Sequence, residues 1–88
     1  MQVLLRPIAK RYLDRLNQPD NGYIKDALHD LSKEPPEGDI RPLSGKGGYF
    51  RLRVGKYRVL FRYESDTIFV TNIYPRGQAY KKKNRRKK

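Results

Sequence analysis

The chain has 88 residues, of which 21 are Lys or Arg and nine are Asp or Glu, so its formal net charge is +12. This length allows one domain with a single small core. The sequence contains no cysteine and only one histidine, His29, which excludes disulfide scaffolds, thiolate metal sites, thiol catalysis and a two-histidine ribonuclease mechanism. No apolar run reaches the ~18 residues that cross a bilayer. We therefore expect a soluble, cytoplasmic domain without a membrane partner.

The positive charge is concentrated in the second half of the chain. Residues 1–48 have eight basic and seven acidic side chains, a net charge of +1, whereas residues 49–88 have thirteen basic and two acidic side chains, a net charge of +11. Seven of these positive charges lie in residues 81–88, which we interpret as a basic C-terminal tail, and residues 49–80 alone still have a net charge of +4. This distribution favours a polyanionic partner, and nucleic acid over a membrane surface or an acidic protein.

The first part of the chain is predicted to form one strand and two helices. Residues 3–5 are a short apolar run typical of a strand that enters the core. A helix follows from Pro7, with an apolar stripe expected at Ile8, Tyr12, Leu13 and Leu16. Residues 17–22 end this helix and offer Asp20 or Asn21 as the N-cap of a second helix. The apolar stripe of that second helix is expected at Ile24, Ala27, Leu28 and Leu31, and the short connection makes the two helices an antiparallel hairpin.

The remaining part is predicted to form a loop and then three strands. Residues 35–48 are rich in proline and glycine and are interpreted as a loop. Three strands are predicted because apolar or aromatic residues alternate with polar ones, or β-branched and aromatic residues are frequent, in residues 49–54, 57–63 and 67–74. Short turns at 55–56 and 64–66 join the strands into an antiparallel meander. The predicted fold class is therefore α+β in the order β-α-α-β-β-β, with one domain over residues 1–80 and the tail over 81–88.

Alternation along the two central strands gathers arginines on one face of the predicted sheet. If the helices cover the aromatic face of residues 57–63, the opposite face presents Arg51, Arg53, Arg58 and Arg62. No carboxylate alternates with these arginines, so like charges are expected to face one another across the hairpin. Such a face suits a phosphate backbone, because each guanidinium can bind two oxygens. The alternative is an ordinary solvated sheet face.

Two segments resemble a known family. Residues 49–61, which contain the motif Gly55-Lys56-Tyr57-Arg58, resemble the central hairpin of the RelE/ParE toxin superfamily. Residues 73–80 resemble its C-terminal motif, in which an arginine (Arg76) is followed four residues later by a tyrosine (Tyr80). With the helical hairpin and the chain length, the likeness covers residues 1–80 and implies a RelE-like fold.

The resemblance to the RelE branch implies a toxin that cuts mRNA in the ribosomal A site and is neutralised by a cognate antitoxin. Carried over by position, Arg58 and Arg76 would stabilise the phosphate, and Tyr80 would stack on the base or help to activate the 2′-hydroxyl. The other residues expected to bind RNA are Arg51, Arg53, Arg62, Lys81, Lys82 and Lys83. The implied partners are mRNA, the 16S rRNA region of the A site and the antitoxin.

The chemistry expected of such a site is metal-independent and needs no cofactor. RNA supplies its own nucleophile, so attack of the 2′-hydroxyl would give a 2′,3′-cyclic phosphate and a 5′-hydroxyl, with fixed arginines stabilising the phosphorane. Pro75 stands where many relatives have a histidine, and uncharged residues fill positions 77–79, which leaves the general acid and base unassigned. Two alternatives remain: a ParE-like, non-catalytic inhibitor of DNA gyrase, and a basic module that binds RNA or the ribosome.

Overall fold

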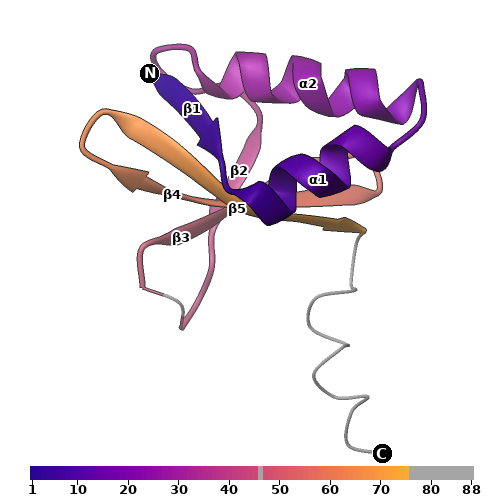
Figure 1. Cartoon of the computed structure of the whole chain (residues 1–88). Coiled ribbons are helices and arrows are strands. Elements are labelled where there is room, and N and C mark those ends of the chain that lie inside the picture. Colours follow the sequence, from indigo (N-terminus) through magenta and orange to yellow (C-terminus); the bar gives the residue numbers. More distant parts are fainter. Residues whose placement is uncertain (46, 76–88) are drawn as a thin grey trace, which may run out of the picture.

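The computed structural model describes residues 1–45 and 47–75, in which two helices pack on one side of a single sheet (Figure 1). The elements, in chain order, are β1 (Gln2–Leu5), α1 (Pro7–Arg15), α2 (Asp20–Leu31), β2 (Asp39–Pro42), β3 (Tyr49–Val54), β4 (Tyr57–Glu64) and β5 (Thr67–Pro75). The predicted α+β class, with an N-terminal strand, a helical hairpin and a C-terminal meander, is confirmed.

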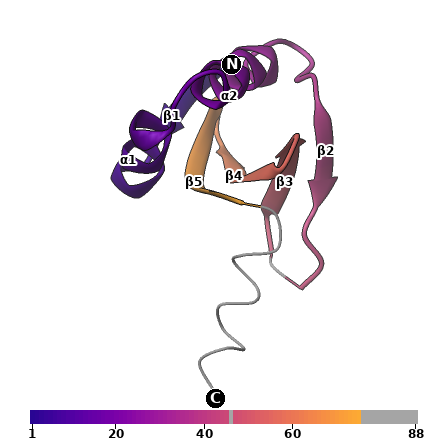
Figure 2. The same ribbon diagram turned by 90° about the vertical axis from the view of Figure 1, so that its right-hand side faces the viewer.

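The sheet has five strands in the order β1-β5-β4-β3-β2. The first strand in the chain pairs in parallel with the last one, and the other neighbouring pairs are antiparallel. Figure 2 shows the sheet strongly twisted, with β1 and α1 at one edge and β2 at the other. The helices cover one face, and no element of the described residues covers the opposite face.

The strand β2 corrects the prediction of a loop over residues 35–48. Asp39–Pro42 pairs with β3, so the antiparallel part of the sheet has four strands rather than three. The strand is short and mostly exposed, and within it only Ile40 packs against the core. Because an edge strand with one inward apolar residue and a terminal proline has almost no period-two signal, its sequence is indistinguishable from that of a loop.

The core lies between the helices and the inner face of the sheet. Its buried apolar side chains alternate along the central strands, as predicted, and recur at helical spacing on both helices; they are Ala9, Leu13, Ile24, Leu28, Leu31, Leu52, Tyr57, Val59, Phe61, Ile68, Val70 and Ile73. The ring of Phe61 stacks on that of Phe50, with centroids 5.7 Å apart. The core therefore fixes which face of β3, β4 and β5 points to solvent.

Two details of the helices differ from the prediction. Ile8 is 56% exposed, and Ala9 takes the buried position in its place, because the first turn of α1 is rotated away from the predicted stripe. Neither Asp20 nor Asn21 is an N-cap: α2 is preceded by Pro19, and the Gly22 N–H in its first turn donates to Oε1 of Gln18. Instead, the Asp20 carboxylate accepts a hydrogen bond from the Tyr57 hydroxyl, and the buried Asn21 amide donates to the Leu13 carbonyl.

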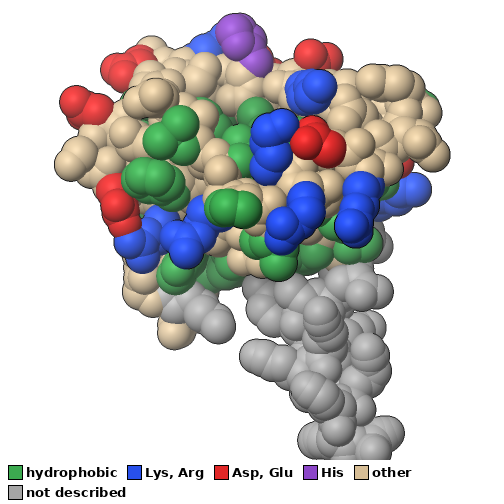
Figure 3. Space-filling view, in the orientation of Figure 1, with side chains coloured by type: hydrophobic (Ala, Val, Ile, Leu, Met, Phe, Trp, Pro, Cys, Tyr) green, Lys and Arg blue, Asp and Glu red, His purple; other side chains and the backbone are tan. Residues whose placement is uncertain are grey.

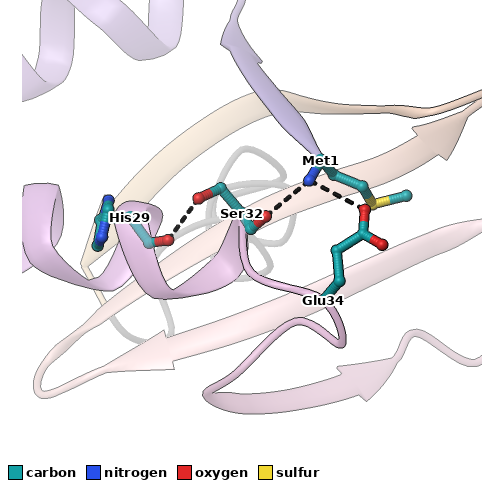
Figure 4. A network of polar contacts seen from close by, with 4 residues as sticks. All are labelled: Met1, His29, Ser32 and Glu34. Atoms are coloured by element: carbon teal, nitrogen blue, oxygen red, sulfur yellow. Dashed lines mark hydrogen bonds and ion pairs between the residues drawn. The ribbon is translucent and has the colours of Figure 1, made fainter.

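The start of the chain is held against the end of α2 (Figure 4). The α-amino group of Met1 donates to the Ser32 carbonyl at 2.7 Å and lies 3.2 Å from the Glu34 carboxylate. A positive charge at a helix C-terminus is favourable, because it binds a carbonyl that has no partner within the helix. This contact helps to set β1 at the edge of the sheet. Within the described part of the chain, no helix is long and apolar enough to cross a membrane.

Candidate functional site

The face of the sheet opposite the helices, which we call the outer face, carries three rows of side chains that run across the strands. Directly paired residues share a face, so the register gives a first row of Asp39, Arg53, Arg58 and Tyr74. The second row consists of Arg41, Arg51, Leu60 and Asn72. The third row consists of Tyr49, Arg62, Phe69 and Leu4. The predicted face of arginines is thus present, and it is wider than two strands.

Arg51 and Arg58 form the centre of the positive charge on this face. Nη1 of Arg51 and Nε of Arg58 are both buried, and neither has a hydrogen-bond acceptor among the described residues. Burial, and then the positive charge of Arg58, lower the pKa of the Arg51 guanidinium from its usual range. A buried donor without an acceptor costs free energy, and so does the repulsion between two cations. An anion bound between them would remove both costs.

The outer face also contains carboxylates. This corrects the expectation that no carboxylate lies among the arginines. Asp39, from the strand that the sequence did not predict, lies opposite Arg53, with its Oδ2 3.5 Å from Nε of Arg53. Its Oδ1 is 3.8 Å from Nε of Arg41. Arg62 pairs with the Glu64 carboxylate. Arg53 does face Arg58 directly, as predicted, but Asp39 offsets part of that repulsion.

Arginines outnumber carboxylates on this face even so. The face has two carboxylates, Asp39 and Glu64, and five arginines: Arg41, Arg51, Arg53, Arg58 and Arg62. Figure 3 shows, on the side that faces the viewer in Figure 1, a band of Lys and Arg side chains across the lower half of the described molecule. The excess of arginine over carboxylate on the outer face favours a polyanionic ligand.

The predicted site residues fall into three groups. Arg51, Arg53 and Arg58 lie together in neighbouring rows. Arg62 lies four residues further along β4, ~13 Å away by the rise of a strand. Arg76, Tyr80, Lys81, Lys82 and Lys83 lie outside the described residues. The described part of β5 ends at Pro75, opposite Tyr57 and next to the pair of Arg58 and Tyr74.

Sequence reasoning missed two charged residues of the outer face, Asp39 and Arg41. Both come from β2, whose pairing with β3 no local pattern in the sequence reveals. In residues 1–45 and 47–75 no cluster of three or more His, Cys, Asp or Glu side chains could hold a metal ion. The chemistry that the described site offers is thus the binding of anions by guanidinium groups.

The comparisons with known proteins give one matching family model and several solved structures of similar fold. The family model described as ParE toxin of type II toxin-antitoxin system, parDE, matches residues 3–80. The RelB-RelE antitoxin-toxin complex from Methanococcus jannaschii is 22% identical, with a TM-score of 0.74 over 90% of this chain and 96% of that chain. The RelBE2 toxin-antitoxin complex from Mycobacterium tuberculosis is 28% identical, with a TM-score of 0.72 over 88% of this chain and 92% of that chain.

A third solved structure, the isolated RelE toxin from E. coli, is 15% identical, with a TM-score of 0.71 over 97% of this chain and 96% of that chain. At this identity the likeness shows the fold alone. No significant match is found among curated protein sequences. The family model covers most of the chain, and the order of strands and helices fits the RelE-like toxin fold. The chain thus belongs to the ParE toxin family of type II toxin-antitoxin systems.

Proposed function

We propose that this toxin is a ribosome-dependent endoribonuclease that cuts mRNA in the ribosomal A site and so inhibits translation in the cytoplasm. The observation that carries the proposal is the pair of guanidinium groups of Arg51 and Arg58, whose buried donors have no acceptor within the described residues. A phosphodiester has the charge and the geometry to satisfy them, because a guanidinium binds two phosphate oxygens at once.

In the proposed reaction, the 2′-hydroxyl of the substrate attacks the adjacent phosphorus and the 5′-oxygen of the next nucleotide leaves. The bond that forms closes a 2′,3′-cyclic phosphate, and the bond that breaks leaves a 5′-hydroxyl after proton transfer. Arg58 and Arg76 stabilise the negative charge of the phosphorane, Arg51 binds the same phosphate from beside Arg58, and Arg53 holds a flanking phosphate. In this scheme the arginines act through their positive charge and their paired N–H donors.

Tyr80 has one of two roles in this scheme. It helps to activate the 2′-hydroxyl, or its ring stacks on the base so that the 2′-hydroxyl is in line with the leaving oxygen. The ribosome orders the mRNA, which reduces the acid-base catalysis that the toxin must supply. We include Lys81, Lys82 and Lys83 as contacts to RNA, and the 16S rRNA region of the A site as part of the binding surface. No metal or cofactor takes part in the proposed steps.

The proposal includes a cognate antitoxin. Several structures with this fold were solved as complexes of a toxin with its antitoxin, among them those from M. jannaschii, M. tuberculosis and E. coli. An outer face rich in arginine would suit an antitoxin segment with acidic side chains, which would cover the same groups that bind phosphate. Neutralisation by direct occlusion of the site follows from this arrangement.

A second candidate function is the inhibition of DNA gyrase without catalysis. The family model favours it, because the family that matches residues 3–80 is that of the ParE toxins. In that case the outer face would bind a protein surface rather than a phosphodiester, and no RNA would be cut.

An experiment in a reconstituted cell-free translation system separates the two candidates. We expect the wild-type chain to cut a defined mRNA at codon-positioned sites, mapped by primer extension, only while ribosomes translate it. Arg58→Ala should slow the cutting by about 10²–10³-fold, because it removes one fixed donor to the phosphorane. As a control, Arg11→Ala removes the same charge from the exposed side of α1 and should leave the rate within a few-fold of wild type.

The products and a parallel assay decide the outcome. Cyclic phosphate and 5′-hydroxyl ends support the proposed chemistry, whereas 3′-hydroxyl and 5′-phosphate ends would contradict it. Intact mRNA together with loss of gyrase supercoiling would overturn the proposal in favour of the second candidate.

A further inference from the structure

The outer face changes character between its two ends. The first two rows, around Arg51 and Arg58, are mainly charged or polar, whereas the third row combines an arginine with two aromatic rings and a leucine: Tyr49, Arg62, Phe69 and Leu4. Each of four neighbouring strands contributes one residue to this third row, which we call the aromatic row. With strands ~4.8 Å apart, it extends ~14 Å across the sheet.

The aromatic row is directed away from the core. Leu4 is 41% exposed, and the side chains of Tyr49 and Phe69 are half-buried. The chain neighbours of Phe69, which are Ile68 and Val70, are fully buried on the other side of the sheet. A single exposed apolar residue on a protein surface is ordinary. In the aromatic row each of four neighbouring strands turns an apolar or stacking group outward, whereas the other two rows are mainly charged or polar. This contrast indicates a surface that binds something flat and partly apolar.

Arg62 occupies a different environment from Arg51 and Arg58. Its charge is paired with the Glu64 carboxylate, and its guanidinium lies over the ring of Tyr49, 5.8 Å from the centroid. This ion pair reduces the attraction of the Arg62 guanidinium for phosphate by a modest amount. Its planar group can still stack on a base, as arginine and aromatic side chains do in proteins that bind single-stranded RNA.

We infer that the aromatic row is a base-stacking subsite for single-stranded RNA, separate from the phosphate subsite at Arg51 and Arg58. This inference rests on the proposed function, and it assigns Arg62 a stacking role in place of the phosphate contact expected from the sequence. The two subsites lie ~13 Å apart along β4, which requires a substrate longer than the scissile dinucleotide. Basic grooves beside stacking platforms are the common design of single-strand binding.

The test is a titration of the full-length protein with a short, fluorescently labelled, single-stranded oligoribonucleotide at several NaCl concentrations. Stacking depends little on salt, whereas each phosphate contact contributes about 0.7 to the slope of log K against log [salt]. Tyr49→Ala should therefore weaken binding about 5- to 150-fold, the range for one stacked base, without changing the slope. Arg58→Ala should instead reduce the slope by about 0.7.

Two control variants match these changes. Tyr49→Phe keeps a stacking ring and should bind as the wild type does. Tyr23→Ala removes a tyrosine that is 60% exposed on α2, on the other side of the sheet, and should have no effect. Circular dichroism of each variant checks that it is folded.

A second measurement needs no variant. Abasic nucleotides are placed at successive positions of the same oligoribonucleotide, and binding of the wild-type protein is measured for each. We expect one or two adjacent positions to weaken binding strongly and the others to have little effect. In Tyr49→Ala the abasic substitution at those positions should cost nothing further, because the ring on which the base stacks is gone.

The outcomes separate this inference from the proposed function. Two results would refute the stacking subsite. One is an equal effect of every abasic position, and the other is a change in the slope of log K against log [salt] in Tyr49→Ala in place of a lower affinity with an unchanged slope. If the wild type cuts mRNA on ribosomes but shows no such position, the subsite alone is refuted and the nuclease proposal stands. If the wild type neither cuts mRNA nor binds the oligoribonucleotide at low salt, both are overturned.

Discussion

Tyr57 joins the sheet to the helical layer through a single hydroxyl group. It donates a hydrogen bond of 2.6 Å to Oδ2 of Asp20, at the start of α2, and its ring is 8% exposed. Tyr57→Phe removes this bond and leaves the packing of the ring unchanged. We expect the free energy of unfolding, measured by urea titration, to fall by about 1.5–3 kcal/mol, the range for a hydrogen bond to a charged group.

The same bond makes stability depend on pH. It is the main reason that the pKa of Tyr57 is raised to about 12, followed by burial and then by the charge of Asp20. In the unfolded chain a tyrosine titrates near ~10, so the contribution is fully present below that pH and is lost as the pH rises through about 12. Tyr57→Phe should flatten this decline relative to the wild type, whereas Tyr23→Phe should reproduce the wild-type curve. Parallel curves for wild type and Tyr57→Phe would contradict the assignment.

Single residues were predictable where their role follows from local spacing. The burial of Ile24, Leu28 and Leu31 and the outward position of Arg58 follow from helical and strand periodicity, and both are confirmed. The role of Asp20 was not predictable, because its partner Tyr57 is 37 residues away in the chain. The local sequence suggests only one role for Asp20, which is to cap the helix that follows it.

Among the elements, the contrast between β2 and the hairpin of β3 and β4 shows what a sequence pattern needs in order to be recognised. The hairpin has alternating residues on both strands and a two-residue turn in which Gly55 has a φ of +58°, so it was predictable almost to the residue. β2 has a single inward apolar residue, Ile40. Its existence depends on backbone pairing with β3, which is a tertiary effect.

The backbone before β2 also depends on a contact that the sequence does not reveal. Gly38 has a φ of +137°, and a Cβ built there would lie 2.6 Å from Cδ1 of Leu52. The chain can therefore enter β2 only with glycine at this position.

Asp39 limits the affinity of the outer face for anions, which leads to a prediction for this element. Asp39→Asn removes the carboxylate beside Arg53 and Arg41, so both guanidinium groups become available to phosphate. We expect binding of a single-stranded oligoribonucleotide, measured by fluorescence anisotropy at fixed salt, to tighten by about 1.5- to 5-fold, the equivalent of one surface ion pair.

The control for this prediction is Asp14→Asn, which changes the net charge by the same amount but on α1, where Asp14 pairs with Lys10. It should alter affinity less than Asp39→Asn does. Equal tightening by the two variants would mean that net charge alone, and not the position of Asp39 on the outer face, governs binding.

At the scale of the whole molecule, the net charge of +12 combines two populations. Seven positive charges lie in residues 81–88, outside the described residues, and five arginines lie on the outer face beside two carboxylates. Charge counting along the sequence separated the tail from residues 49–80 and predicted a polyanionic partner. It could not show which arginines of the sheet are neighbours, because that depends on the register of the strands. The fold class was predictable from the sequence. Of the site, only the arginines that alternation places on the outward side of β3 and β4 were predictable.

The two populations should contribute to binding in different ways. We propose that the tail attracts RNA without regard to position, while the outer face selects where the phosphodiester lies. Removing residues 81–88 should then weaken binding to an oligoribonucleotide and reduce the slope of log K against log [salt] by up to about 5, since seven charges at about 0.7 each is the upper limit. The positions at which mRNA is cut in a translation assay should not move.

A chain in which the seven basic residues of the tail are replaced by glutamine keeps its length and provides the control. It should match the truncated chain in both affinity and slope if the tail acts through charge alone. A truncated chain that retains the wild-type slope would show that the tail does not contact RNA. Cuts that move to new codons on truncation would show that the tail, rather than the outer face, selects the site, because a non-specific electrostatic term cannot favour one phosphodiester over its neighbours.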